Sequence, residues 1–174
     1  GLDWSYTSNG FGTATPELNG TAQANALTVS LLQNPALRPT PQDIAWTRDA
    51  FRDLLKIRQS TELLRLKTSQ EVQARLRFFN TDAQADARLV VGHLDGRGLN
   101  DFAELLYFVN AAPEAQRFSA SELAHKAFVL HPVLAGQHAA DPLVRQAARY
   151  NPLNGEFEIP ARSAVVFVVK GPQP

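Results

Sequence analysis

The fold class depends on the stretch Val72-Gln73-Ala74-Arg75-Leu76-Arg77-Phe78-Phe79, in which apolar and polar residues begin to alternate. Before this stretch, apolar residues recur at the spacing of an α-helix. Successive side chains of a β-strand point to opposite faces of a sheet, so the alternation predicts a half-buried strand. The change of period near residue 60 therefore predicts a β domain over residues 61–174, preceded by a helical segment.

Several more short strands are predicted after this one. They occupy residues 88–93, 105–110, 116–118, 127–130, 156–159 and 164–169. Turn-forming residues separate them, among them Asp95-Gly96-Arg97-Gly98, His131-Pro132 and Asn154-Gly155, the last of which is typical of a type I′ hairpin. Many short strands with no long helix between them predict an antiparallel β-sandwich.

The helical segment contains two predicted helices. The shorter covers residues 21–33, and the longer begins at Thr40-Pro41-Gln42-Asp43. There the Thr and Asp side chains can accept from free amides of the first turn, and the Pro has no amide hydrogen to satisfy. Over residues 41–59, apolar residues fill about half of the helical wheel, which predicts burial against a broad partner surface. Arg58 projects into this apolar arc. Because an unpaired buried charge is costly, Arg58 is expected to form a buried ion pair.

Composition excludes several classes of protein. The chain has 174 residues, with 17 Lys and Arg against 17 Asp and Glu, and it contains neither Cys nor Met. This composition rules out a disulfide scaffold and gives no overall basic surface for nucleic acid. The longest apolar run, residues 164–169, is far shorter than the roughly 18–20 residues that cross a bilayer. We therefore expect no nucleic-acid or membrane partner, and the start at Gly1 without any Met leads us to expect a fragment.

The polar residues form no familiar catalytic or metal-binding motif. No histidine stands four residues from another or beside an acid in a known ligand pattern, so all four are interpreted as ordinary surface or edge residues. Asp49 and Asp53 lie one helical turn apart and could act as an acid–base pair, but the neighbouring arginines favour a solvated charged face. The sequence has no glycine-rich phosphate loop, so its glycines are interpreted as turn residues.

One segment near the start is rich in aromatic and short polar residues: Asp3-Trp4-Ser5-Tyr6-Thr7-Ser8-Asn9-Gly10-Phe11-Gly12. Aromatic rings stack on the apolar faces of sugars, and amides bond their hydroxyl groups. Candidates for a substrate cleft are therefore Trp4, Tyr6, Asn9 and Phe11. In the alternative interpretation, the rings only anchor a long loop to the body of the protein.

Taken in order, several stretches resemble the C-terminal region of type I pullulanases and limit dextrinases, the starch-debranching members of the α-amylase superfamily of glycoside hydrolases. Residues 51–61, followed by 64–66, resemble the final helix of that family's (β/α)₈ barrel as it runs into the C-terminal domain, and residues 72–81 resemble the first strand of that domain. Its closing portion is similar to residues 130–133, 140–144 and 159–168. Residues 3–12 resemble a long loop near the family's substrate cleft.

The resemblance implies a mainly β fold, in which an antiparallel β-sandwich over residues 61–174 follows the last helices of a truncated (β/α)₈ barrel in residues 1–60. The family's nucleophilic Asp, its acid–base Glu and a second Asp would all precede residue 1, so no catalytic residue is expected here. The parent enzyme would hydrolyse α-1,6-glucosidic linkages in pullulan, amylopectin and limit dextrins, whereas the fragment would be structural and non-catalytic.

The resemblance also implies the partners, which are the rest of the barrel and, for the parent, an α-glucan. No metal or cofactor is expected in the fragment, although calcium could belong to the parent. A bacterial parent would be extracellular or periplasmic.

Two other functions stay open at this point. A self-standing starch- or carbohydrate-binding module would use Trp4, Tyr6 and Phe11, or aromatic residues of the sandwich, to hold its ligand. An immunoglobulin-like interaction domain with an accidental helical prefix is the second, and the capped helix that leads directly into the first strand argues against it.

Overall fold

The computed structural model describes residues 22–82, 85–99 and 101–171. The chain divides into two compact units, Gly1–Phe51 and Arg52–Pro174. Helix α2, Pro41–Gln59, contributes residues to both units. The assignment of residues 1–60 to a barrel and of residues 61–174 to a sandwich stays a prediction.

In the first unit, the described residues form helices. Helix α1 covers Ala22–Gln33, and the short 3₁₀ helix η1, Pro35–Leu37, follows it. At the start of α2, the Asp43 amide donates to Thr40 Oγ1 at 3.2 Å, and the Thr40 amide donates to Asp43 Oδ2 at 2.8 Å. This reciprocal cap confirms the predicted start of the long helix.

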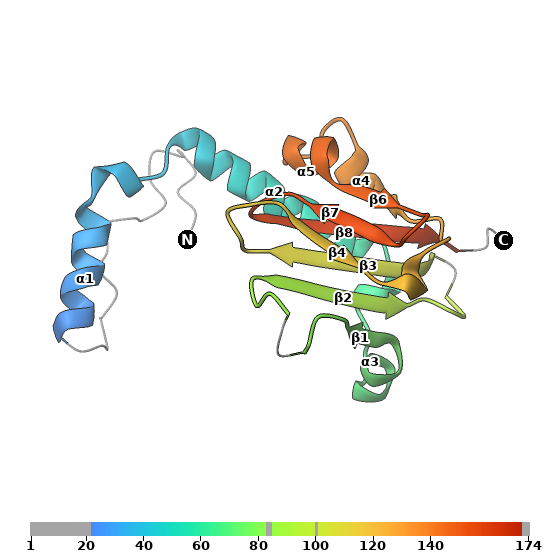
Figure 1. The fold of residues 1–174 in the computed structure, drawn as a ribbon. Helices are drawn as coiled ribbons and strands as arrows, with labels where there is room; N and C mark the ends of the chain where they lie inside the picture. Colours follow the sequence, from blue (N-terminus) through green and yellow to red (C-terminus); the bar gives the residue numbers. More distant parts are fainter. Residues whose placement is uncertain (1–21, 83–84, 100, 172–174) are drawn as a thin grey trace. The chain divides into compact units, whose positions relative to one another are not determined.

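The second unit contains two antiparallel sheets (Figure 1). The larger sheet has the order β1-β2-β3-β8-β5, and its strands are Leu76–Phe78, Leu89–Asp95, Phe102–Asn110, Ser163–Lys170 and Val129–Leu130. The smaller sheet has the order β4-β7-β6, with strands Gln116–Ser119, Glu156–Ile159 and Arg149–Asn151. Short helices connect them, namely η2 at Glu62–Leu64, α3 at Ser69–Arg75, η3 at Ser121–Leu123, α4 at Pro132–Ala135 and α5 at Pro142–Ala147.

The two sheets pack face to face through aromatic rings. Phe108 and Phe167 of the larger sheet lie 5.1 Å and 5.2 Å, between ring centroids, from Phe157 of the smaller one. All three rings are buried in one apolar cluster. A mainly β chain with an antiparallel sandwich is therefore confirmed.

The stretch that predicted the first strand is mostly helical, which corrects the prediction. Helix α3 takes Ser69–Arg75, and only Leu76–Phe78 pairs with β2. The cause lies upstream, where Thr68 and Glu71 form a capping box in which each side chain accepts a hydrogen bond from the other's backbone amide. The helix therefore starts before the alternating residues and continues through Arg75.

The predicted strands after residue 80 are confirmed in position, and β6 is an addition. Strand β6 pairs with β7 across the turn at residues 152–155. Gly155 has a positive φ of 68°, but Asn154 does not, so the turn is not type I′. Instead, the Gly155 amide donates to the Asn151 carbonyl, which closes a longer loop.

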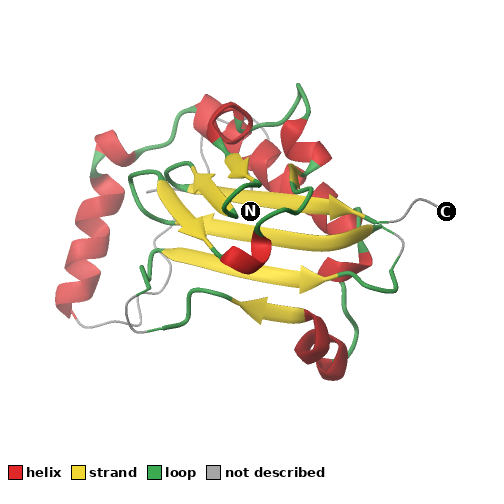
Figure 2. Cartoon of the chain, turned by 45° about the vertical axis from the view of Figure 1, so that its right-hand side comes forward, coloured by secondary structure: helices red, strands yellow, loops and turns green. Residues whose placement is uncertain are grey.

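The larger sheet has two different faces. The inner face, which meets the smaller sheet, carries Val91, Phe108 and Val165 at one level of the register. The outer face carries Gly92, Tyr107 and Val166, and the C-terminal half of α2 lies behind it in both views (Figures 1 and 2). One half of the outer face is buried, but exposed apolar side chains remain on the other half: Phe78, Val90 and Val109.

Candidate functional site

The sequence-predicted substrate residues Trp4, Tyr6, Asn9 and Phe11 lie outside the described residues. Arg58, in contrast, is described, and its side chain is exposed on α2. No hydrogen bond or ion pair is found for Arg58 within residues 22–82, 85–99 and 101–171. The prediction of a buried ion pair for Arg58 therefore stays a prediction, and it requires a surface beyond the described part of this chain.

The C-terminal half of α2 carries apolar side chains on two of its sides. Ile57 is buried in the core of the second unit and marks the side that faces the sandwich. Leu54, Leu55 and Arg58 point elsewhere, with 40% of Leu54 and 48% of Leu55 exposed. Leu54 and Leu55 stand four and three residues before Arg58, so all three side chains adjoin on the helix surface. We call these three residues the α2 patch.

Asp53 fixes α2 to the sandwich through a long-range hydrogen bond. Its side chain is only 5% exposed, and Oδ2 accepts from the Ala140 amide at 2.8 Å while Oδ1 accepts from Lys56 Nζ at 2.8 Å. The interpretation of Asp53 as part of a solvated face is therefore wrong. A carboxylate held in these two contacts has a structural role at the loop before α5.

His131 makes a second connection to the end of α2, and its interpretation as a surface or edge residue is also wrong. Its side chain is 1% exposed, and Nδ1 accepts from the Val133 amide at 3.2 Å at the start of α4. The proton of the neutral ring is therefore on Nε2, which donates to Ser60 Oγ at 3.0 Å. Burial lowers the pKa of His131 to about 4, so the ring is neutral near pH 7.

The Ser60–His131 pair has the separation of a serine–histidine dyad but not its chemistry. A general base must accept a proton from the serine. Nε2 of His131 already carries a proton and is the hydrogen-bond donor to Ser60 Oγ, so it cannot act as that base. The Ser60 hydroxyl in turn donates to the Ile57 carbonyl at 2.8 Å. This arrangement closes the C-terminus of α2 and does not activate a nucleophile.

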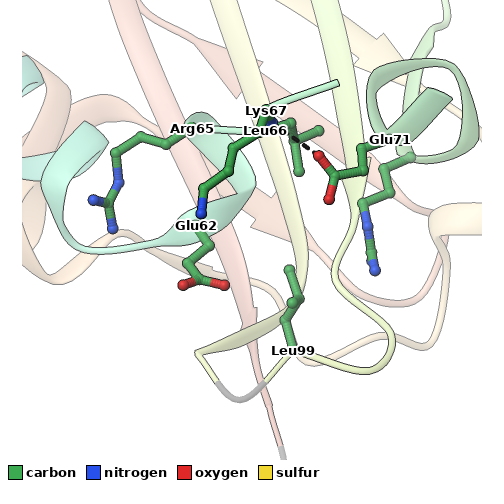
Figure 3. Close-up of a pocket in the computed structure, with 7 residues that line it drawn as sticks. Glu62, Arg65, Leu66, Lys67, Glu71 and Leu99 are labelled. Carbon is green, nitrogen blue, oxygen red and sulfur yellow. Dashed lines mark hydrogen bonds between the residues drawn. The ribbon is translucent and has the colours of Figure 1, made fainter. Parts of the chain in front are cut away.

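A polar pocket of about 220 Å³ lies where the segment after α2 meets α3 and the β2–β3 loop. Figure 3 shows the side chains of Glu62, Lys67 and Glu71 extending toward the same space, with Leu99 pointing toward them. Arg65, Leu66 and Arg75 complete its lining. The pocket therefore contains two carboxyl groups, the minimum that glycoside hydrolysis requires.

Neither the geometry nor the charge of this pocket suits acid–base catalysis. Glu71 accepts hydrogen bonds from the amides of Lys67 and Thr68, and these bonds hold its pKa below the ordinary value. A general acid needs the opposite shift. Arg75 Nη1 is also committed, because it donates to the carbonyls of Asp95 and Arg97. The pocket residues thus hold η2 and α3 against the sheet.

A second cluster of charged groups lies on the inner face of the larger sheet. Glu104 accepts from His93 Nε2 at 2.8 Å and from Lys126 Nζ at 2.7 Å. Burial alone would raise the pKa of Glu104, but these hydrogen bonds outweigh it, and the pKa lies below the ordinary value. Glu104 is therefore ionised, and it forms an ion pair with Lys126 and a cross-strand hydrogen bond with His93.

An apolar cavity of about 360 Å³ opens on the covered half of the outer face. Leu94 and Tyr107 of the sheet form one wall, and Leu63 and Leu64 of η2 form another. Leu66, Val72 and Leu76 complete the lining. Such a surface suits packing against other apolar side chains, because it offers almost no groups to bind polar ligands.

Two other kinds of site are absent from the described residues. These residues contain no group of three or more His, Cys, Asp or Glu side chains that could hold a metal ion. None of the described helices is long and apolar enough to cross a membrane. The predicted substrate loop, residues 3–12, lies outside the described residues.

The sequence matches the family described as alpha-1,6-glucosidases, pullulanase-type, C-terminal, over residues 6–170. It is also 32% identical over 176 residues to "Pullulanase 1, chloroplastic" of Arabidopsis thaliana. That alignment covers 96% of this chain but only 18% of the plant protein. The chain thus spans less than a fifth of the curated relative that it matches.

Solved structures with the same fold include PulA of Klebsiella oxytoca, with a TM-score of 0.78 and 21% identity over 99% of this chain and 16% of that one. A maltotriose complex of PulA from Klebsiella pneumoniae has a TM-score of 0.78 and 20% identity, over 99% of this chain and 19% of that one. These structures share the fold of the described residues. In both proteins the matching region is a small part of a much longer chain.

Proposed function

Since the chain belongs to the family of pullulanase-type α-1,6-glucosidases and corresponds to their C-terminal region, we propose that it is the C-terminal part of a starch-debranching enzyme. The enzyme would hydrolyse α-1,6-glucosidic linkages in pullulan, amylopectin and limit dextrins. The observation that carries this proposal is the family match over residues 6–170, which covers nearly the whole chain. The description of one similar structure as a maltotriose complex supports an α-glucan as the substrate.

In this proposal the chemistry takes place outside the chain. Retaining hydrolysis needs a carboxylate nucleophile and a carboxylic acid about 5–5.5 Å apart, one on each side of the scissile bond. Glu71 and Glu104 are instead kept ionised by backbone amides and by His93 and Lys126. The nucleophile, the acid–base residue and the second carboxylate would therefore lie on barrel strands that precede residue 1.

The chain itself would have a structural role in the enzyme. Asp53 and Ser60 attach the end of α2 to the sandwich, while Leu54 and Leu55 remain exposed on another side of the same helix. A helix with one side in the sandwich and a second apolar side available is suited to join two layers. We propose that it joins the sandwich to the barrel.

The proposal is tested with the longer polypeptide that carries this chain at its C-terminus. That protein should release reducing ends from pullulan, which has α-1,6 linkages, and few or none from linear amylose, which has only α-1,4 linkages. The 174-residue chain alone should release none from either. Absence of pullulan hydrolysis by the longer protein would contradict the proposed activity, and hydrolysis by the chain alone would contradict its structural role.

A self-standing carbohydrate-binding module is the second candidate, supported by the aromatic residues Trp4, Tyr6 and Phe11 in one short glycine-containing segment. It is distinguished by affinity electrophoresis of the chain in gels with and without amylopectin. Retardation that disappears in Trp4→Ala would favour the module. Equal mobility in both gels would favour the structural role.

A further inference from the structure

The sandwich leaves the α2 patch uncovered. Within the second unit, Asp53 and Ile57 are the α2 residues that are buried, and they stand four residues apart on one side of the helix. The patch of Leu54, Leu55 and Arg58 lies on a neighbouring side, while Lys56 and Gln59 belong to the polar side. Two leucines beside a lone arginine form a surface that is apolar except for one positive charge.

Arg58 has a local explanation that needs no partner. It stands in the last turn of α2, where a cation interacts favourably with the partial negative charge at the helix C-terminus. That explanation accounts for a positive charge but not for its placement between two leucines, since Lys56 already provides a basic residue in the same turn. It also applies equally to lysine and arginine, which makes it testable.

We infer that a carboxylate on the catalytic barrel of the longer enzyme pairs with Arg58 when the barrel covers the α2 patch. The inference rests on the proposed function and specifies the partner surface: an apolar area with one acidic group opposite Arg58. The planar guanidinium binds a carboxylate through two parallel hydrogen bonds, which suits an ion pair within an apolar contact better than lysine does.

Two observations favour the barrel, rather than a second copy of the chain, as the surface that covers the α2 patch. The related proteins contain far more chain than this region, which makes up 16–19% of the solved structures and 18% of the plant protein. A symmetric pairing of two copies through the patch would also bring Arg58 close to its own counterpart, and like charges in an apolar contact repel each other. A carboxylate from a different surface avoids this repulsion.

Coverage of the patch is tested by cysteine labelling, because the 174 residues contain no cysteine. Leu55→Cys should react with a thiol reagent at the rate of an exposed residue in the isolated chain. In the longer enzyme it should react at least about 100-fold more slowly, as measured by mass spectrometry of the peptide. Lys56→Cys, on the opposite side of the helix from the patch and with a side chain that is 61% exposed, is the matched control and should react at similar rates in both proteins.

The predicted carboxylate is tested by two substitutions of Arg58, one that removes the positive charge and one that keeps it. Arg58→Met keeps length and apolar contact but removes the charge, so a buried carboxylate would lose its partner. The apparent Tm of the longer enzyme should then fall, while that of the isolated chain changes by no more than about 2 °C. Arg58→Lys should recover part of the loss in the longer enzyme.

Each outcome decides one point. A higher Tm for Arg58→Met in the longer enzyme would mean an apolar partner without an acid and would overturn the inference. Equal Tm shifts for Arg58→Met in both proteins would mean that Arg58 interacts only with the C-terminus of its own helix. This result too would overturn the inference. Concentration-dependent protection of Leu55→Cys in the isolated chain would assign the patch to a second copy. Because pullulan hydrolysis is measured separately, each of these results can occur while the proposed function holds.

Discussion

The two faces of the larger sheet are built from similar residues but are closed to different degrees. On the inner face, Phe108 and Phe167 pack against Phe157 of the smaller sheet, and all three side chains are buried. On the outer face, Leu63 of η2 covers only one half, and Phe78 and Val109 remain exposed on the other. Residues of the inner face therefore stabilise the sandwich, whereas the exposed residues of the outer face are available to contact another surface.

The two faces are also covered by different kinds of contact. Apolar rings close the inner face, and their contribution to stability does not depend on protonation near neutral pH. Part of the contact between α2 and the sandwich is instead polar, through Ser60 and His131. Substitution of the buried rings and titration of His131 should therefore test these two contacts separately.

The largest effect is expected from Phe157→Ala on the inner face. The Phe157 ring is fully buried and has centroids of Tyr150, Phe108 and Phe167 within 4.6–5.2 Å. Removing it should lower the free energy of unfolding by about 3–5 kcal/mol through lost burial and the cavity left behind. Urea denaturation of the isolated chain measures this loss.

Phe78→Ala on the outer face is the matched control for that loss. Phe78 is 46% exposed and makes one edge-to-face ring contact, with Tyr107 at 6.5 Å. Its truncation should cost about 1 kcal/mol. Similar losses for the two phenylalanines would contradict the proposed difference between the faces.

A smaller effect, about 3 kcal/mol, is expected from acidification through His131. The ring is neutral in the fold, with a pKa of about 4, against an ordinary value of 6.5 in the unfolded chain. As the pH falls from 6.5 to 4, the unfolded chain takes up a proton that the folded chain does not, so the free energy of unfolding decreases. Urea denaturation across this pH range measures the decrease.

His131→Asn is the variant that isolates this effect. The amide oxygen of asparagine can accept from the Val133 amide, as Nδ1 does, but the side chain does not titrate. The variant should be less stable than the natural chain near pH 7 and should lose less stability between pH 6.5 and 4. Parallel pH profiles would assign the pH dependence to other groups.

These residues also indicate how much of the fold could be predicted from the sequence. The start of α2 was predictable because Thr40, Pro41 and Asp43 cap it through contacts within one turn. Alternation over residues 72–79 was misleading, since a period of two does not exclude a short helix. The Thr68-x-x-Glu71 pattern was available in the sequence as a signal for that helix.

The site residues depended on distant parts of the chain. Periodicity identified Arg58 as unusual, because a charge within an apolar arc is visible in the sequence alone. It could not identify Asp53 as buried, because the amide that it binds belongs to Ala140, in a loop far along the chain. The same holds for His131, whose burial results from packing beside Ser60 and Phe102. Local patterns predict caps and faces, whereas burial of single polar groups follows from tertiary contacts.

A still smaller effect is expected from Gly92→Ala on the outer face, next to Tyr107. A methyl group at Gly92 would collide with the Tyr107 ring, but that ring is only half-buried and can swing toward solvent. The substitution should therefore cost only about 1 kcal/mol, at the low end for overpacking. In a double-mutant cycle with Tyr107→Ala, the cost should disappear, whereas a cost that persists would place the strain in the backbone.

The smallest effect is expected from Val109→Thr, on the uncovered half of the outer face. Val109 pairs with Val90, and both side chains are exposed, so a hydroxyl group at this position stays hydrated and the free energy of unfolding should change by less than about 0.5 kcal/mol. Val91→Thr, one residue along β2 from Val90, places the same hydroxyl on the fully buried inner face and should cost about 1–3 kcal/mol. Denaturation of the two variants compares the faces with one chemical change. A loss for Val109→Thr as large as that for Val91→Thr would mean that the outer face is already covered in the isolated chain, and the surface left for a partner would then be confined to α2.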